Sequence, residues 1–500
     1  MAGIRKDIAT LGTWSDELIW YALAVGELRT RGLDVRTSWT YLAAIHGINA
    51  QGWLDQGIIP PGTPAPSQGE RRLMWDQCQH AGWFFLPWHR GYLAAFESIL
   101  ADWIRGEGGP NDWVLPYWNY LDDTNPTARE MPQEFLDATL PAHAPFGAGD
   151  SNPLANANRG PATVLGPQPW IPIDISLDAQ TSQEVYTSEP GTLGYGGPIS
   201  GFDQQGNAFG AVESDPHNFV HVMVGGDTSP NPTGWMFDPA FAALDPIFWV
   251  HHCNIDRLWA AWMTVQENEQ ETTQPWRNGP FPRQFAMPTP GATLDVFTPG
   301  ETLPGERLEP QYDSLTSGTG ITPPAPTPAP EPPSPDLAAM TSPPSSGRGA
   351  SALFGANDRT LTVKDAPVRS EVALRQEPAE PAFASTSVTQ ERIFLNIEGV
   401  RGNAASGVLM AVITTPGEAA QEGAEETLVF FGLQKATITD GAHAGNGLSA
   451  TVDVTGKVRA LQEASGEPLE KLEVILSQPT EASGEAITVD RISLYRRRGG

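Results

Sequence analysis

Residues 245–262 read DPIFWVHHCNIDRLWAAW, and this stretch decides the fold of the first half of the chain. Helix-like periodicity over residues 247–264 predicts a helix that carries two adjacent histidines, His251 and His252. Adjacent side chains on a helix diverge by about 100°, so we do not expect both to reach one metal ion. Asp256 lies one turn after His252 and would orient a ligand or balance charge. The alternative is an aromatic core helix in which histidine and aspartate form a polar pair.

A second pair of histidines lies just before this stretch, in DPHNFVH at residues 215–221. Pro216 suits the first position of a helix. The spacing of four residues then puts His217 and His221 on the same face, which is a metal-ligand geometry. A zinc protease would need a glutamate directly after the first histidine, where this chain has Asn218.

A third cluster, CQHAGWFFLPWHR at residues 78–90, places His80 and His89 in one of the most apolar segments of the chain. Each could be a satisfied core histidine or a metal ligand, because a buried imidazole needs partners for both nitrogens. Six neutral imidazoles without a thiolate or carboxylate ligand suit copper better than calcium, magnesium or structural zinc. The sequence therefore predicts a paired copper centre with three histidines for each ion, which are His46, His80 and His89 for one and His217, His221 and one of the adjacent pair His251 and His252 for the other.

The chain divides into regions of different composition. All 16 tryptophans lie between Trp14 and Trp276, which indicates one large aromatic-rich domain over residues 1–315. Helix-like periodicity predicts a mainly α, helical-bundle core with long loops, its helices at about 15–33, 36–48, 84–106, 216–224 and 247–264. Residues 323–335 hold eight prolines in thirteen positions, so we expect a Pro/Ala/Ser-rich linker over 316–385. Short β-branched runs from Arg392 onward predict a small all-β sandwich over 386–500.

Composition also bounds the partners of the chain. It carries 30 basic and 59 acidic residues, a net charge of −29, which disfavours nucleic acid and anionic membranes as partners. No apolar run reaches the roughly 18–20 residues that span a bilayer. The first residues lack an apolar signal core, so we expect a cytoplasmic protein, with export by another route or a mature secreted form left open. Two cysteines, Cys78 and Cys253, cannot build a disulfide framework.

The segments HAGWFFLPWHRGYLAAFE, DPHNFVHVMVGG and DPIFWVHHCNIDRLWAAW resemble the two copper-binding regions of the tyrosinase and catechol oxidase family. The resemblance covers roughly residues 5–315 and extends to molluscan haemocyanin. It implies two copper ions, the first held by His46, His80 and His89. It assigns the second copper to His217, His221 and His252, and places His251 and Asp256 next to the ligands rather than among them.

The resemblance implies further roles for single residues. Cys78 stands two residues before His80, an arrangement that forms a thioether in fungal and molluscan relatives, whereas Cys253 reads as an ordinary buried thiol. Glu213 and Asn218 match a pair that holds a proton-accepting water in relatives that hydroxylate monophenols. The residue after His221 is Val222, so that side of the pocket entrance is expected to be small and uncharged.

Together these features predict a copper-dependent phenol oxidase that ortho-hydroxylates monophenols and oxidises o-diphenols to o-quinones with O2. The C-terminal region resembles, more weakly, the β-domain that shields latent plant and fungal enzymes, so we expect a latent proenzyme. No residue that plugs the pocket can be identified from the sequence. The alternatives are a catechol oxidase or o-aminophenol oxidase, a haemocyanin-like oxygen carrier, and a structural zinc protein; the oligomeric state is left open.

Overall fold

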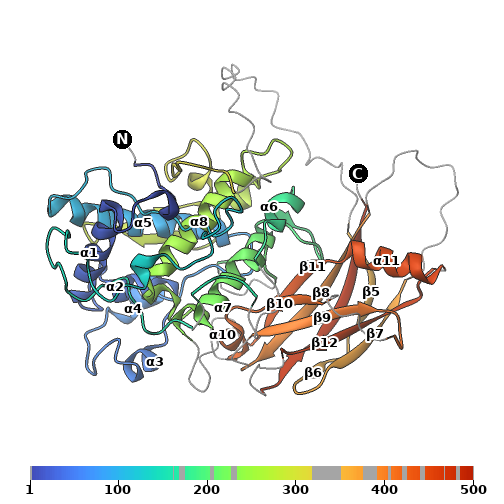
Figure 1. Cartoon of the computed structure of the whole chain (residues 1–500). Helices are drawn as coiled ribbons and strands as arrows, with labels where there is room; N and C mark the ends of the chain where they lie inside the picture. The colour runs from blue at the N-terminus through green and yellow to red at the C-terminus, as the bar shows by residue number, and fades with distance from the viewer. Residues whose placement is uncertain are drawn as a thin grey trace.

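Figure 1 shows a computed structural model of the 500-residue chain, with helices gathered in its first part and strands in its last. No described helix combines the length and apolarity needed to cross a bilayer. The residues that the structure describes are 3–160, 163–167, 175–202, 208–226, 234–317, 351–375, 391–403, 407–418, 425–439, 445–466, 468–479 and 485–498.

Helices build the first part of the chain, and all five predicted from periodicity are present. The longer ones are α1 (Asp16–Thr30), α2 (Trp39–His46), α5 (Phe85–Gly106), α7 (Phe219–Gly225) and α8 (Pro246–Trp262). Shorter helices are α3 (Ala50–Asp55), α4 (Gln68–Met74), α6 (Asp178–Ser182) and α9 (Gln274–Asn278). A kinked turn, η3 (Glu213–Asn218), leads directly into α7.

Helix α8 lies at the centre of this domain. Asp245 caps its first turn by accepting a hydrogen bond from the Ile247 amide, and Pro246 occupies the first helical position, where no amide donor is needed. Every residue of α8 except Ala260 is buried, so its polar side chains must find partners inside the core. Helix α5 packs along it, so the two helices place their histidines side by side.

A sheet of ten strands builds the second part. Its strands are β5 (Ala352–Asn357), β6 (Leu361–Val363), β7 (Val368–Leu374), β8 (Arg392–Gly402), β9 (Val408–Thr414), β10 (Glu426–Val429), β11 (Leu448–Asp453), β12 (Lys471–Ser477), β13 (Ile487–Val489) and β14 (Arg491–Arg497). They pair in the order β10-β9-β12-β7-β5-β14-β8-β13-β6, with β11 added beside β8. Two helices, α10 (Leu433–Thr437) and α11 (Thr455–Ser465), complete the domain. Strands from both ends of this path contribute to one apolar core, so the sheet curls over its own apolar face.

The linker predicted over residues 316–385 is wrong for residues 351–375, which form β5, β6 and β7. Strand β7 alternates buried and exposed residues and pairs with β12, whose residues lie about a hundred positions later in the chain. Composition alone suggested a linker because Ala, Ser and Gly are common there, while the partner strand is remote. The proline-rich residues 323–335 lie outside the described residues.

The two parts share apolar cores where they meet (Figure 1). Phe209 and Ala81 of the helical part belong to the core of the sheet, whereas Val408 and Val429 of the sheet join the core of the helical part. An ion pair of 2.6 Å joins the Lys435 ammonium in α10 to the Asp76 carboxylate. The β-domain therefore covers the helical domain by both apolar burial and a charge contact.

Candidate metal centre

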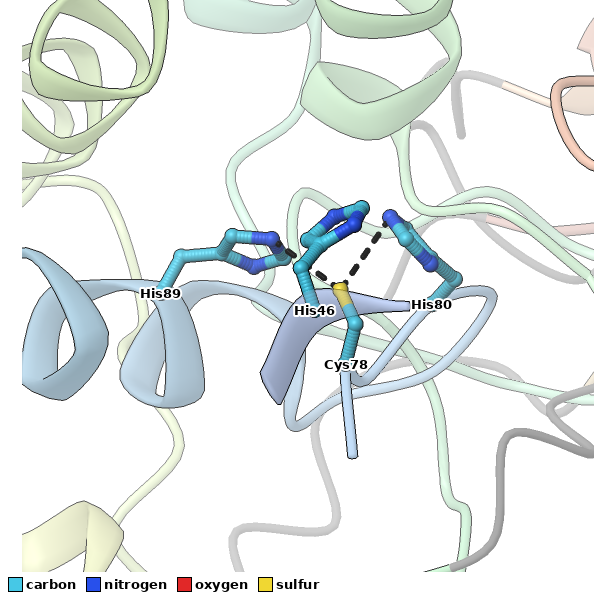
Figure 2. Close-up of side chains that lie close together, drawn as sticks. All are labelled: His46, Cys78, His80 and His89. Atoms are coloured by element: carbon cyan, nitrogen blue, oxygen red, sulfur yellow. Dashed lines mark hydrogen bonds between the residues drawn. The ribbon is translucent and has the colours of Figure 1, made fainter. Parts of the chain in front are cut away.

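One group of potential ligands consists of His46, Cys78, His80 and His89, whose ligand atoms all lie within 4.8 Å of one another (Figure 2). His46 ends α2, and its Nδ1–H donates to the Pro239 carbonyl at 2.8 Å. His89 lies in α5 and donates from Nδ1 to the Phe85 carbonyl at 2.8 Å. These bonds keep the proton on Nδ1 and leave the Nε2 lone pair for a metal. The His46 Nε2 is buried and has no partner among the described residues.

The second group consists of His217 at the end of η3, His221 in α7, and His251 and His252 in α8. The His221 Nδ1–H donates to the Met236 carbonyl at 2.8 Å, so its Nε2 is free to ligate. That Nε2 lies 3.3 Å from the Nε2 of His252. Two nitrogens each about 2.0–2.1 Å from one tetrahedral ion are separated by a similar distance, so this pair fits a shared metal ion.

The two groups face each other across a dry, aromatic space. The rings of His89 and His252 stack with centroids 4.4 Å apart and planes 7° from parallel. Phe85 lies 4.6 Å from His89 and 4.7 Å from His217, and Phe248 lies 4.3 Å from His252. The structure thus brings together all six histidines predicted as ligands, three in each group, with aromatic rings packed between and behind them.

Burial keeps these imidazoles neutral. It lowers the pKa of His46 to about 3 and that of His217 to about 3. The pKa of His80, His89, His221 and His252 also falls well below the ordinary value, mainly through burial and further through the neighbouring histidines. A neutral imidazole is the form that binds a metal, so the site is prepared for cations by the exclusion of water.

Comparison with known proteins agrees with this geometry. The sequence model for the common central domain of tyrosinase matches residues 36–265. Tyrosinase HcTyr1 of Hahella sp. (strain CCB-MM4) is 30% identical over 506 residues, which cover 96% of this chain and 97% of that protein. The chain belongs to the tyrosinase family. It is an enzyme of the tyrosinase and polyphenol oxidase class, a dinuclear copper family, and its two histidine groups could each hold a metal ion.

Two further comparisons cover the catalytic region and the fold. The chloroplastic polyphenol oxidase of Malus domestica is 30% identical over 203 residues, 39% of this chain and 32% of that protein. The solved structure of latent apple tyrosinase superposes with a TM-score of 0.59 at 20% identity, covering 99% of this chain and 97% of that one. Residues 350–497 match a model described as a domain of unknown function, DUF7868. The two-part architecture is therefore that of a known tyrosinase fold.

The cysteine of the first group lies between two ligands of this tyrosinase. The Cys78 sulfur is 3.4 Å from the His80 Nε2 and 3.3 Å from the His89 Nε2 (Figure 2). Burial raises the pKa of its thiol well above the ordinary value. The thioether to His80 stays a prediction, and the sulfur lies close enough to make it testable. Cys253 is also buried and unbridged, with its sulfur 3.7 Å from the Leu115 carbonyl.

Glu213 and Asn218 both lie at the metal centre of this tyrosinase. The Glu213 carboxylate accepts the Ala81 amide at 2.8 and 3.0 Å, directly beside His80. Burial raises the pKa of this carboxyl well above its usual value. The Asn218 Oδ1 accepts a hydrogen bond from the His217 Nδ1 at 2.9 Å, whereas the Asn218 Nδ2 is buried without a partner among the described residues. A free amide donor and a buried carboxyl group therefore flank the histidines.

The two residues predicted to support the ligands have different surroundings. His251 places its Nδ1 3.0 Å from the Tyr120 hydroxyl and its ring 5.5 Å from that of His217. Asp256 does not orient an imidazole, which corrects that half of the expectation. Both of its oxygens are engaged by charged or hydroxyl donors: Arg90 at 2.6 Å, Arg5 at 3.1 Å and Tyr312 at 2.6 Å. It balances buried positive charge, because Arg90 has no other ion pair among the described residues, whereas Arg5 also pairs with Glu97 at 2.9 Å.

Phe431 is the residue of the site that the sequence did not reveal. It follows β10, and its ring stacks on His221 with centroids 4.2 Å apart. Its edge-on contacts reach His80 at 5.5 Å and His217 at 5.7 Å. Gly432, with φ of 84°, makes the left-handed turn that lets the chain reverse behind the ring. The only local signal was two phenylalanines before a glycine, in a run that otherwise predicted a strand.

Proposed function

We propose that the chain is a latent tyrosinase that ortho-hydroxylates monophenols and oxidises o-diphenols to o-quinones, consuming O2. Ligands His46, His80 and His89 would hold one copper, and His217, His221 and His252 the other. Bound copper supplies the activation of dioxygen. The Nδ1 bonds of His46, His89 and His221 to backbone carbonyls fix the orientation of those rings. Phe85 and Phe248 keep water away from the reacting centre.

The observation that carries monophenol hydroxylation is the placement of Glu213 and Asn218. A phenol has a pKa near 10 and must lose its proton to bind as a phenolate at neutral pH. Asn218 offers its unpartnered amide to a water, and burial raises the pKa of the Glu213 carboxyl well above its usual value, which makes its carboxylate a stronger proton acceptor. In this proposal the proton moves from the phenol through that water to Glu213.

Latency rests on Phe431. Its ring occupies the space over His221, His217 and His80, where an aromatic substrate would have to lie. The residue is only 3% exposed, so the β-domain closes the site in this arrangement. The similarity to a solved tyrosinase described as latent supports the same reading.

Oxygen uptake on a monophenol, an o-diphenol and an o-aminophenol tests the proposal on three forms of the copper-loaded protein. These are the intact chain, the chain cut by trypsin at Arg348 and freed of its C-terminal domain, and intact Phe431→Ala. We expect low turnover for the intact chain and high turnover, with the monophenol included, for the other two. Phe354→Ala, a phenylalanine of the β-domain away from the site, is the matched control and should remain latent.

Each alternative predicts a different pattern. An oxygen carrier loses a domain on cleavage without gaining turnover. A catechol oxidase or an o-aminophenol oxidase gains turnover on its own substrate but shows no uptake with the monophenol. Latency is contradicted if the intact chain and Phe431→Ala turn over equally fast.

A further inference from the structure

A chain of contacting aromatic rings leads from His89, a predicted copper ligand, to Trp39 at the start of α2. Trp88 lies 4.8 Å from the ring of His89 and 4.8 Å from that of Tyr92. Tyr92 lies 4.7 Å from Trp249, which lies 6.1 Å from Trp39. Every step joins two neighbouring rings, so the series of rings runs without a break from His89 to Trp39.

The elements of the core fix this chain of rings. Trp88 and Tyr92 lie one turn apart on α5, Trp249 lies on α8, and Trp39 begins α2. Trp88 and Trp249 are fully buried, whereas Trp39 keeps 3% of its surface exposed beneath the guanidinium of Arg29, 5.4 Å from the ring centroid. The chain of rings therefore starts at His89, a predicted ligand, and ends at the buried ring of Trp39, which is covered by the exposed side chain of Arg29.

Hydrogen bonds favour positive charge on the tryptophan rings that lie further from the metal group. Loss of an electron leaves a tryptophan as a cation whose N–H becomes a stronger donor, and a carbonyl acceptor stabilises it. The Trp249 Nε1 donates to the Ala243 carbonyl at 3.2 Å and the Trp39 Nε1 to the Leu244 carbonyl at 3.1 Å. The Trp88 Nε1 is buried without a partner among the described residues. An oxidised ring is thus more stable further from the metal.

Tyr92 acts as a bridge in this chain, because it keeps its proton. Its hydroxyl donates to the Leu42 carbonyl at 2.6 Å, and a backbone carbonyl is too weak a base to take that proton. Burial also raises the pKa of the Tyr92 hydroxyl well above its ordinary value. The tryptophans on either side are therefore the rings on which a positive charge would rest.

We propose that Trp88, Tyr92, Trp249 and Trp39 form a relay that returns single electrons to the oxidised copper centre when no phenol is bound. One electron passes from Trp88 to the centre, Trp249 replaces it by way of Tyr92, and Trp39 replaces the electron of Trp249. A small one-electron reductant at the surface, a thiol or an enediol such as ascorbate, then restores Trp39. No bond forms or breaks, and each ring keeps its proton. The relay rests on the proposed oxidase function. It is needed where Phe431 closes the site to phenol.

The competing explanation is that these rings only fill the core. Trp249 stacks on Phe96 at 3.6 Å, so packing certainly uses it. The two explanations differ for Trp249→Phe, because phenylalanine retains an apolar ring but is far harder to oxidise. Trp262→Phe is the matched control: Trp262 is equally buried and stacks on Tyr195 at 4.4 Å, away from the chain of rings.

The test exposes the intact, copper-loaded protein to hydrogen peroxide without phenol, with and without ascorbate. Freeze-quenched electron paramagnetic resonance detects aromatic radicals, and peptide mass spectrometry maps oxidised residues. We expect oxidation at Trp39 that ascorbate suppresses. In Trp249→Phe it should fall several-fold while oxidation of Trp88 and His89 rises; Trp262→Phe should match the parent.

A second variant tests the final step without touching the core. The exposed cation of Arg29 opposes positive charge on Trp39, so Arg29→Gln should increase oxidation at Trp39. Equal oxidation maps for Trp249→Phe and Trp262→Phe, or no effect of Arg29→Gln, overturn the relay. Failure to bind copper, or to change optically with peroxide, would instead contradict the proposed oxidase function.

Discussion

At the scale of single residues, the histidines and their immediate neighbours define the chemistry. Replacing His89 or His252 by alanine should reduce the copper content to one ion per molecule or fewer and abolish turnover, since each group has three predicted histidine ligands. Metal analysis of the purified protein measures this. His143→Ala is the control, because His143 lies outside both groups and contacts the Trp14 carbonyl at 3.1 Å. Full copper content in His252→Ala would contradict its assignment.

Glu213→Gln tests proton transfer separately from copper binding. The amide can still accept the Ala81 hydrogen bond but cannot take a proton. We expect turnover of an ordinary phenol, with a pKa near 10, to fall by about 10²-fold or more in the Phe431→Ala background. A polyfluorinated phenol that is already ionised at neutral pH should be much less affected. Equal losses for both substrates would show that Glu213 acts otherwise.

The buried imidazoles also make the copper-free protein sensitive to acid. His46 and His217 have pKa values of about 3 in the folded chain, against an ordinary value near 6.5 in the unfolded chain. Below about pH 6.5 the unfolded state binds more protons, so the free energy of unfolding should fall as the pH drops toward 3. Urea denaturation between about pH 7 and pH 5 measures this dependence. His217→Asn should reduce it, and an unchanged slope would contradict the assignment of these pKa shifts.

At the scale of elements, helices α5 and α8 are joined by a buried charge network. Arg90 on α5 and Asp256 on α8 are 1% and 2% exposed and lie 2.6 Å apart. Asp256→Asn leaves Arg90 and Arg5 without a full counter-charge, so we expect a loss of about 3–5 kcal/mol in the free energy of unfolding. Chemical denaturation measures it. Asp102→Asn, which breaks an exposed pair with Arg105 on the same helix, should cost about 1 kcal/mol or less.

Some elements of the fold could be predicted from the sequence, and others could not. Helix α8 and the helix over about residues 216–224 were predicted because periodicity and histidine spacing lie within a single stretch of chain, although the first part of the second helix is the kinked turn η3. Strand β7 was missed because β12, its partner, is remote in sequence. The partners of Asp256, Arg5 and Arg90, were missed for the same reason: they lie 251 and 166 positions away.

At the scale of the whole molecule, the β-domain places Phe431 against the histidines of the helical domain. Sequence reasoning predicted a shield but could not find Phe431, because its role exists only once the two domains dock. The Lys435–Asp76 pair is the charge contact described between them. It is partly exposed, so its contribution is about 1 kcal/mol or less.

Lys435→Gln should therefore raise the basal turnover of the intact enzyme by a few-fold, because it weakens docking without removing Phe431. Oxygen uptake at low ionic strength measures this effect, and added salt should raise the turnover of the parent toward that of the variant. Lys471→Gln, which breaks a pair with Glu371 inside the β-domain, should leave turnover unchanged. No gain in Lys435→Gln would mean that apolar burial and the hydrogen bonds between the domains hold them together without this ion pair.

The interlocked cores carry a cost for activation. Phe209 and Ala81 are buried at 1% and 0% exposure among side chains of the sheet. Once proteolysis strips that sheet away, they face water as part of a sticky rim around the catalytic mouth. If proteolysis activates the enzyme as proposed, the liberated helical domain should therefore be short-lived in free solution and tend to self-associate.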